Sequence, residues 1–162
     1  MHLMKILLAC TFFFCGINSY SQDAAAITHI DSIVNTINKL HLQVYEDSVT
    51  KKIADPEMEM KTYLLEVFDD GVLKKYQYKM KSLDNENGIY TTFIQSTAFY
   101  YDQDQLIKVE QSRLQFEKRS DLNWYYSNDT LLKYPGNDPG RSDSFLSAAK
   151  EFLKHAHWRQ KK

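Results

Sequence analysis

The sequence predicts an α+β fold: a long N-terminal helix, a curved antiparallel meander of five to six strands, and a C-terminal helix packed on the sheet. Two observations predict it. Apolar residues recur three and four positions apart in both terminal regions, which is the spacing of an amphipathic helix. Between them, β-branched and aromatic residues alternate with polar ones, and short clusters (DDG, DNENG, DQDQ, KRSD and SND) interrupt the alternation as hairpin turns do.

The N-terminal helix is expected over residues 24–47. Its apolar positions form one stripe along about six turns, made by Ile27, Ile30, Val34, Ile37 and Val44. Pro56 keeps the residue before it out of helical geometry, so the helix must end before this point. Residues 48–57 are then expected to be a connector.

The C-terminal helix is expected over residues 143–158, with Ser142 or Asp143 as its N-cap. Its apolar residues again follow the helical spacing, at Phe145, Ala148, Ala149, Phe152, Leu153 and Ala156. The last turn is basic, which suits the negative end of the helix dipole.

The meander is expected over residues 58–134 and contains three copies of a short unit. In each copy an aromatic residue is followed by a turn residue, a Leu and a Lys, and the copies begin at Phe68, Tyr101 and Tyr126. Gly, Asp and Asn tolerate left-handed turn geometry, so each unit is expected to be a hairpin corner. The unit resembles those of many uncharacterised exported bacterial proteins and, more distantly, MORN-type repeats. This resemblance implies a hairpin and no particular function.

The second copy, Asp102-Gln103-Asp104-Gln105, also raises the question of a metal loop. A calcium-binding loop needs about six to eight oxygen ligands, together with a central Gly and a closing Glu. No copy of the unit has this pattern. We therefore interpret the four residues as a structural turn.

The first 21 residues have the composition of a secretory signal peptide, with Lys5 near the start and an apolar run from Ile6 to Ile17. The run is too short to cross a bilayer core of about 30 Å as a helix, so an exported, periplasmic or secreted protein without a transmembrane segment is expected. The alternative is lipid anchoring at Cys10 or Cys15, because Leu7-Leu8-Ala9-Cys10 resembles the bacterial lipoprotein motif. Residues 22–162 are expected to form a single α+β domain, which contains no cysteine.

The chain shows no pattern of catalysis, cofactor binding or nucleic-acid binding. Its formal net charge of −1 argues against contact with a phosphate backbone as its main role. The pair His29 and His41 diverges in direction on the first expected helix, as does the pair His155 and His157 on the second, so neither can hold a metal ion. The chain also lacks a nucleophile elbow and a glycine-rich phosphate loop. We predict no catalytic residue, no cofactor and no metal.

A candidate ligand surface follows from the expected strand register. The strand at residues 89–101 is too long to stay straight, and the next strand changes phase as a bulge would cause, so a sharply curved sheet is expected. With four-residue loops at 102–105 and 118–121, one face carries Tyr90, Ile94, Arg113, Trp124 and Tyr126. The opposite face, expected to be core, carries Ile89, Phe93, Leu114, Phe116 and Tyr125.

Four residues of the first face are the candidate ligand-binding residues: Tyr90, Arg113, Trp124 and Tyr126. An Arg can stack on a ligand and hydrogen-bond to it, and Tyr and Trp offer rigid contact area. The simpler interpretation is that these rings pack beneath the second helix, as most large aromatic side chains do.

The first functional hypothesis is therefore an exported, non-enzymatic binding or interaction module, with a small molecule, a glycan or an envelope protein as its partner. The alternative is a small pocket protein of the nuclear transport factor two-like or cystatin-like type. Such a protein would act as an enzyme or carry an apolar ligand. A deep pocket with a charged pair would favour the enzyme, and a dry apolar tunnel would favour the carrier.

Overall fold

The computed structural model describes residues 23–39, 43–52, 59–86, 89–135 and 140–159. The expected signal peptide, with Cys10 and Cys15, lies outside the described residues. Among the described residues, no helix has both the length and the apolar character that crossing a membrane requires.

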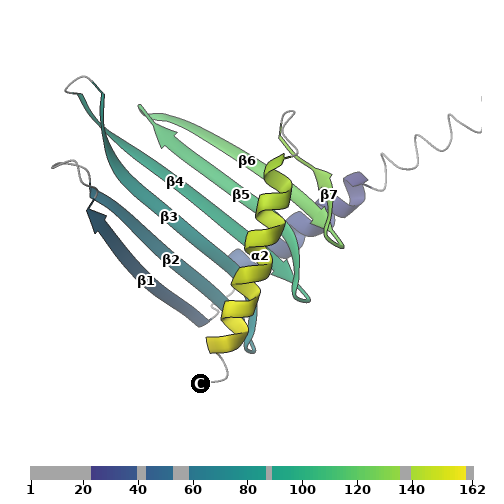
Figure 1. Cartoon of the computed structure of the whole chain (residues 1–162). Helices are drawn as coiled ribbons and strands as arrows, with labels where there is room; N and C mark the ends of the chain where they lie inside the picture. The colour runs from purple at the N-terminus through teal and green to yellow at the C-terminus, as the bar shows by residue number, and fades with distance from the viewer. Residues whose placement is uncertain (1–22, 40–42, 53–58, 87–88, 136–139, 160–162) are drawn as a thin grey trace, which may run out of the picture.

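The chain folds into two helices and one seven-stranded sheet (Figure 1). The N-terminal helix covers residues 23–39. The strands are β1 (Gln43–Lys52), β2 (Glu59–Asp69), β3 (Val72–Glu86), β4 (Ile89–Asp102), β5 (Gln105–Gln115), β6 (Lys118–Ser127) and β7 (Thr130–Lys133). The last element is α2 (Gly140–Arg159), close to the range predicted for the C-terminal helix.

The strands lie in the order β1 to β7, and each pairs antiparallel with the next one along the chain. The prediction of an α+β fold with an antiparallel meander is thus confirmed. The sheet has seven strands, however, and not five or six.

The additional strand is β1, and it corrects the expected helix. The last described helical residue is 39, and Gln43–Lys52 pairs with β2 where the end of the helix and a connector were expected. Val44 fits the helical stripe and a strand equally well. Because Tyr45, Val49 and Thr50 are aromatic or β-branched, this segment favours a strand.

The hairpin turns are tight and share one geometry. Both turn residues have positive φ in Asp70–Gly71 (46° and 78°), Gln103–Asp104 (49° and 60°) and Asn128–Asp129 (50° and 60°). Two such residues are the signature of the type I′ turn, whose twist matches that of the flanking strands. The prediction that the three repeated units are hairpin corners, including the one at Asp102-Gln103-Asp104-Gln105, is confirmed.

The turn between β5 and β6 lies elsewhere than expected. It is formed by Phe116 and Glu117, with φ of 49° and 61°, while residues 118–121 belong to β6. Leu114 and Phe116, expected in the core, are 38% and 53% exposed. The prediction failed because Lys118-Arg119-Ser120-Asp121 is as polar as a loop, and the real turn contains none of the usual turn residues.

The register of β4 on β5 also differs by one residue from the expected one. Gln95 lies opposite Arg113 instead of Ser112, because the bulge falls at Tyr100/Tyr101, next to the turn. A slip of one residue moves every side chain of a strand to the other face of the sheet. Further bulges occur at Val67/Phe68 and Tyr125/Tyr126, and such bulges increase the local twist visible in Figure 1.

The two helices cover opposite faces of the sheet, with α2 in front and the N-terminal helix behind in Figure 1. The α2 face is the larger core cluster, formed by Phe68, Leu73, Phe99, Tyr101, Leu106, Val109, Trp124 and Tyr126 of the sheet with Phe145, Ala149 and Ala156 of α2. The other face is formed by Ala98, Tyr100, Ile107 and Tyr125 of the sheet with Ile30, Val34 and Ile37 of the N-terminal helix. Neither helix is predicted from sequence to take a particular face.

Candidate functional site

The predicted ligand-binding residues do not form an exposed aromatic surface. Trp124 and Tyr126 are 2% and 0% exposed and belong to the cluster under α2, where the Trp124 ring lies 4.8 Å from that of Phe145 in an edge-on arrangement. Both rings lie where the simpler interpretation puts them. Tyr90 lies in β4, and its side chain falls outside the part of the chain that is described.

Arg113 shares the α2 face with Trp124, because it alternates along β5 with the buried Val109. Within the described part of the chain, Arg113 Nε and Trp124 Nε1 are buried and have no hydrogen-bond partner. Val109 lies opposite Trp124, so Arg113 is about 13 Å further along the sheet. The two donors therefore do not converge on one small ligand.

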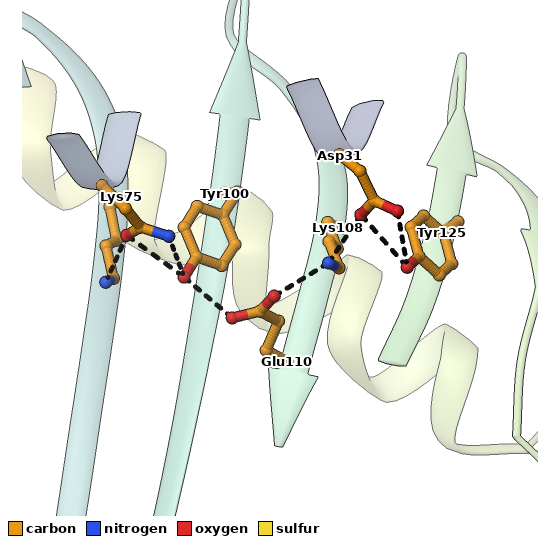
Figure 2. A network of polar contacts seen from close by, with 7 residues as sticks. Asp31, Lys75, Tyr100, Lys108, Glu110 and Tyr125 are labelled. Carbon is orange, nitrogen blue, oxygen red and sulfur yellow. Dashed lines mark hydrogen bonds and ion pairs between the residues drawn. The ribbon is translucent and has the colours of Figure 1, made fainter. Parts of the chain in front are cut away.

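The N-terminal helix is attached to its face of the sheet by a polar network centred on Lys108 (Figure 2). Lys108 Nζ donates a hydrogen bond to Asp31 Oδ1 at 2.8 Å and forms an ion pair with Glu110 Oε1 at 2.8 Å. It also lies 5.0 Å from the centre of the Tyr125 ring, whose hydroxyl donates to Asp31 Oδ1 at 3.1 Å. Asp31 comes from the helix, so these bonds cross from the helix to the sheet.

The network continues through Tyr100 towards β3. The Tyr100 hydroxyl donates to Glu110 Oε2 at 2.9 Å and lies 3.3 Å from Asn38 Nδ2, which donates to it. Asn38 Oδ1 in turn accepts a hydrogen bond from Lys75 Nζ at 3.0 Å. Asn38 is therefore a second attachment of the helix to the sheet.

The ionisable groups of the network have shifted pKa values. Burial alone would lower the pKa of Lys108, but the hydrogen bonds to Asp31 and Glu110 outweigh this effect and raise it. Burial lowers the pKa of Lys75, against the attraction of Glu110. Burial also raises the pKa of Tyr100 and Tyr125. The network thus holds Lys108 charged and the tyrosines neutral, as a structural attachment requires.

A hollow of 820 Å³ lies on the same face as the network, over β1 to β4. It is lined by Asp47, Ser48, Tyr63, Leu64, Leu65, Gln77, Lys79, Lys81 and Ile94. Leu65 lies opposite Gln77, and Gln77 lies opposite Ala98, which packs beneath the N-terminal helix. The hollow therefore begins in the same row of residues as Ala98, on the strands beside the helix-covered part of this face, and none of the residues of the network lines it.

Two lysines face each other across strands at the far side of the hollow. Lys61 of β2 lies directly opposite Lys81 of β3, and the same row continues through Ile94 and Leu114 to Arg119. Of the two lysines, Lys81 lines the hollow and Lys61 lies beside it. No acidic residue occupies the row.

The adjacent row adds an aromatic ring and a third lysine. Tyr63 lies opposite Lys79, and Tyr63 is 44% exposed, one of the few large apolar side chains open to water. Among the described residues, no carboxylate lies within ion-pair distance of the Lys79 or Lys81 ammonium. The hollow thus combines an apolar floor at Leu65 and Ile94 with two ammonium groups, and the Asp47 carboxylate that also lines it forms no ion pair with either.

Two smaller hollows lie beside the helices. One of 220 Å³ lies between α2 and the turns at Asp104 and Asp129, where Lys150 and Asp129 form an exposed ion pair at 2.9 Å. The other, of 210 Å³, lies between the N-terminal helix and the start of β3. Within the described residues, no group of three or more His, Cys, Asp or Glu side chains could hold a metal ion.

No protein-family model, curated protein or solved structure matches this chain. The hollow and its lysines were not among the candidates from sequence. The alternation Lys79-Met80-Lys81 indicates two lysines on one strand face, but Lys61 joins them only through the register of β2 on β3.

Proposed function

We propose that the chain is an exported, non-enzymatic binding module whose ligand is an amphipathic organic anion, held in the hollow over β1 to β4. One observation carries the proposal: Lys79 and Lys81 line the hollow from one strand, and no carboxylate of the described residues lies within ion-pair distance of either ammonium group. A bound anion would supply a counter-ion to these two ammonium groups.

The rest of the hollow suits the apolar part of such a ligand. Leu65 and Ile94 form the floor, and the exposed ring of Tyr63 offers a flat surface for an aromatic or aliphatic group. Gln77 donates a hydrogen bond to Ser96 at 2.7 Å and is therefore already engaged within the sheet. The lysines provide attraction and the apolar side chains provide contact area, as in most small-molecule sites.

The alternatives fit this hollow less well. A carrier of a purely apolar ligand gains nothing from two ammonium groups at the site, whose partial burial by the ligand would cost free energy. An enzyme needs acid and base groups that meet at one point in the site. The charged cluster around Lys108 instead bonds the N-terminal helix to the sheet, and none of its groups lines the hollow. Export itself is inferred from the first 21 residues of the sequence.

The experiment compares an anionic probe with an uncharged one of similar shape. Fluorescence titration with anilinonaphthalene sulfonate should show saturable binding at a single site, whereas the uncharged phenylnaphthylamine should bind more weakly. The variant Lys79→Gln should weaken binding of the sulfonate by about three- to fivefold, the effect of losing one solvent-exposed charge pair. It should leave binding of the uncharged probe unchanged.

The matched control is Lys154→Gln, since Lys154 is exposed on α2 and remote from the sheet hollow. It should bind both probes as the unaltered protein does. Equal affinity for the charged and uncharged probes, or equal losses in the Lys79 and Lys154 variants, would show that the hollow does not select an anion.

A further inference from the structure

The turn between β5 and β6 presents an exposed apolar tip. Phe116 is 53% exposed and Leu114 is 38% exposed, the former being the most exposed large apolar side chain in the described part of the chain. In Figure 1 this turn lies at the end of the sheet that projects past α2. Leu114 lies opposite Ile94, so the tip adjoins the hollow.

The backbone conformation of the tip is unfavourable for phenylalanine. Phe116 and Glu117 have φ of 49° and 61°, a region that bulky side chains rarely occupy. The three other hairpin turns that the structure describes each use Asp, Asn or Gly for at least one of the two positions. Asn at position 116 would relieve the strain. The ring therefore opposes the fold at this position without contributing to its core.

Charged side chains of both signs lie at the tip, where the exposed Glu117 belongs to the turn itself and the neighbouring cations outnumber the carboxylates. Lys118 and Arg119 follow it directly, and both are exposed. Arg119 lies opposite Leu114 and forms an ion pair with Asp121 at 2.9 Å. Lys81 lies opposite Ile94 in the same row. Two exposed apolar side chains are too little area for a stable protein interface, which buries on the order of 1,000 Å² or more. They suit weak, reversible insertion into a membrane interface, to which nearby cations add attraction for anionic lipid.

We propose that the β5–β6 tip docks onto an anionic lipid bilayer, with Phe116 and Leu114 entering the boundary between headgroups and acyl chains. Lys118 and Lys81 then lie above anionic headgroups, where each cation is attracted by the surface potential. This docking goes beyond the proposed ligand site, because it concerns a surface next to the hollow and not the hollow itself. It also brings the hollow close to the bilayer surface.

The test is flotation of the purified protein with two kinds of vesicle, one of phosphatidylcholine alone and one of equal parts phosphatidylcholine and phosphatidylglycerol. The unaltered protein should float with the anionic vesicles and only weakly with the neutral ones. Phe116→Asn removes the ring and suits the turn, so it should fold at least as stably. Its partition onto anionic vesicles should fall by about tenfold or more, the effect of losing one buried large apolar side chain.

The matched control is Tyr134→Ser, which removes another exposed aromatic side chain, 38% exposed, after the end of β7. It should float as the unaltered protein does. The proposal is overturned if the unaltered protein does not float with anionic vesicles, or if Phe116→Asn floats as well as it does. The proposal is also overturned if the Phe116 side chain is needed for binding to another protein but not for binding to vesicles. Since Phe116 does not line the hollow, Phe116→Asn should keep full affinity for anilinonaphthalene sulfonate. A negative result for membrane docking can therefore be told apart from a negative result for the anion site.

Discussion

Replacement of Trp124 by Ala should lower the free energy of unfolding by about 3–5 kcal/mol, because it removes a large buried side chain from the centre of the core. Trp124 is 2% exposed and packs edge-on against Phe145, so its loss opens a cavity between the sheet and α2. Chemical denaturation followed by far-ultraviolet circular dichroism measures the change.

The matched variant is Trp124→Phe. It keeps an aromatic ring against Phe145 and deletes the indole N–H, which has no hydrogen-bond partner among the described residues. Its cost should be well below that of Trp124→Ala, since no unpaired donor remains buried. If Trp124→Ala instead lost less than about 1 kcal/mol, the side chain could not be part of a packed core.

The second large effect is expected in alkaline solution, where stability should fall steeply above about pH 10. Burial raises the pKa of Tyr100, Tyr101, Tyr125 and Tyr126. In the unfolded chain these phenols ionise at about pH 10, so the unfolded state binds fewer protons than the folded state above this pH, and stability decreases as pH rises. For each phenol that stays protonated in the folded state, the free energy of unfolding should fall by at most about 1.4 kcal/mol per pH unit.

Lys108 changes stability in the same direction. Its raised pKa means that its ion pairs contribute fully below about pH 10, the ordinary lysine value, and that this contribution is lost as pH rises towards the folded-state pKa. Denaturation curves from neutral pH to about pH 11 measure the combined slope. Tyr101→Phe should reduce it, because Tyr101 is fully buried and its hydroxyl donates only to Ala149 O, at 3.4 Å. Constant stability across pH 10 would contradict the buried, protonated state of these phenols.

The sequence predicted those hairpins whose turn residues belong to types that readily adopt positive φ. Asp70, Gly71, Asn128 and Asp129 favour positive φ, and their hairpins were placed correctly. The turn at Phe116 and Glu117 could not be predicted in this way, because neither residue favours that conformation. Once this turn was misplaced, the register of β5 on β6 and the faces assigned to Leu114 and Phe116 were misplaced with it.

The strand β1 was missed for a different reason. Val44 satisfies both a period of 3.6 and a period of 2, so a helical stripe could be extended through it. The candidate site was harder to predict from the sequence than the strands were. Trp124 and Arg113 were recognised as chemically capable, but whether a ring is core or surface depends on which face α2 covers. The hollow lies over several strands, and only their pairing brings Tyr63 of β2 beside Lys79 and Ile94 of β4 beside Lys81.

The proposal that Lys79 and Lys81 hold an anion in the hollow can be tested with one variant. Lys81→Glu tests it most directly, with the free energy of unfolding and the affinity for anilinonaphthalene sulfonate measured on the same sample. A carboxylate at this position, opposite Lys61, should stabilise the fold by about 0.2–1 kcal/mol. Affinity for the sulfonate should fall by about tenfold, because an attraction is replaced by a repulsion. Unchanged affinity in a variant that remains folded would show that Lys81 does not hold the anion.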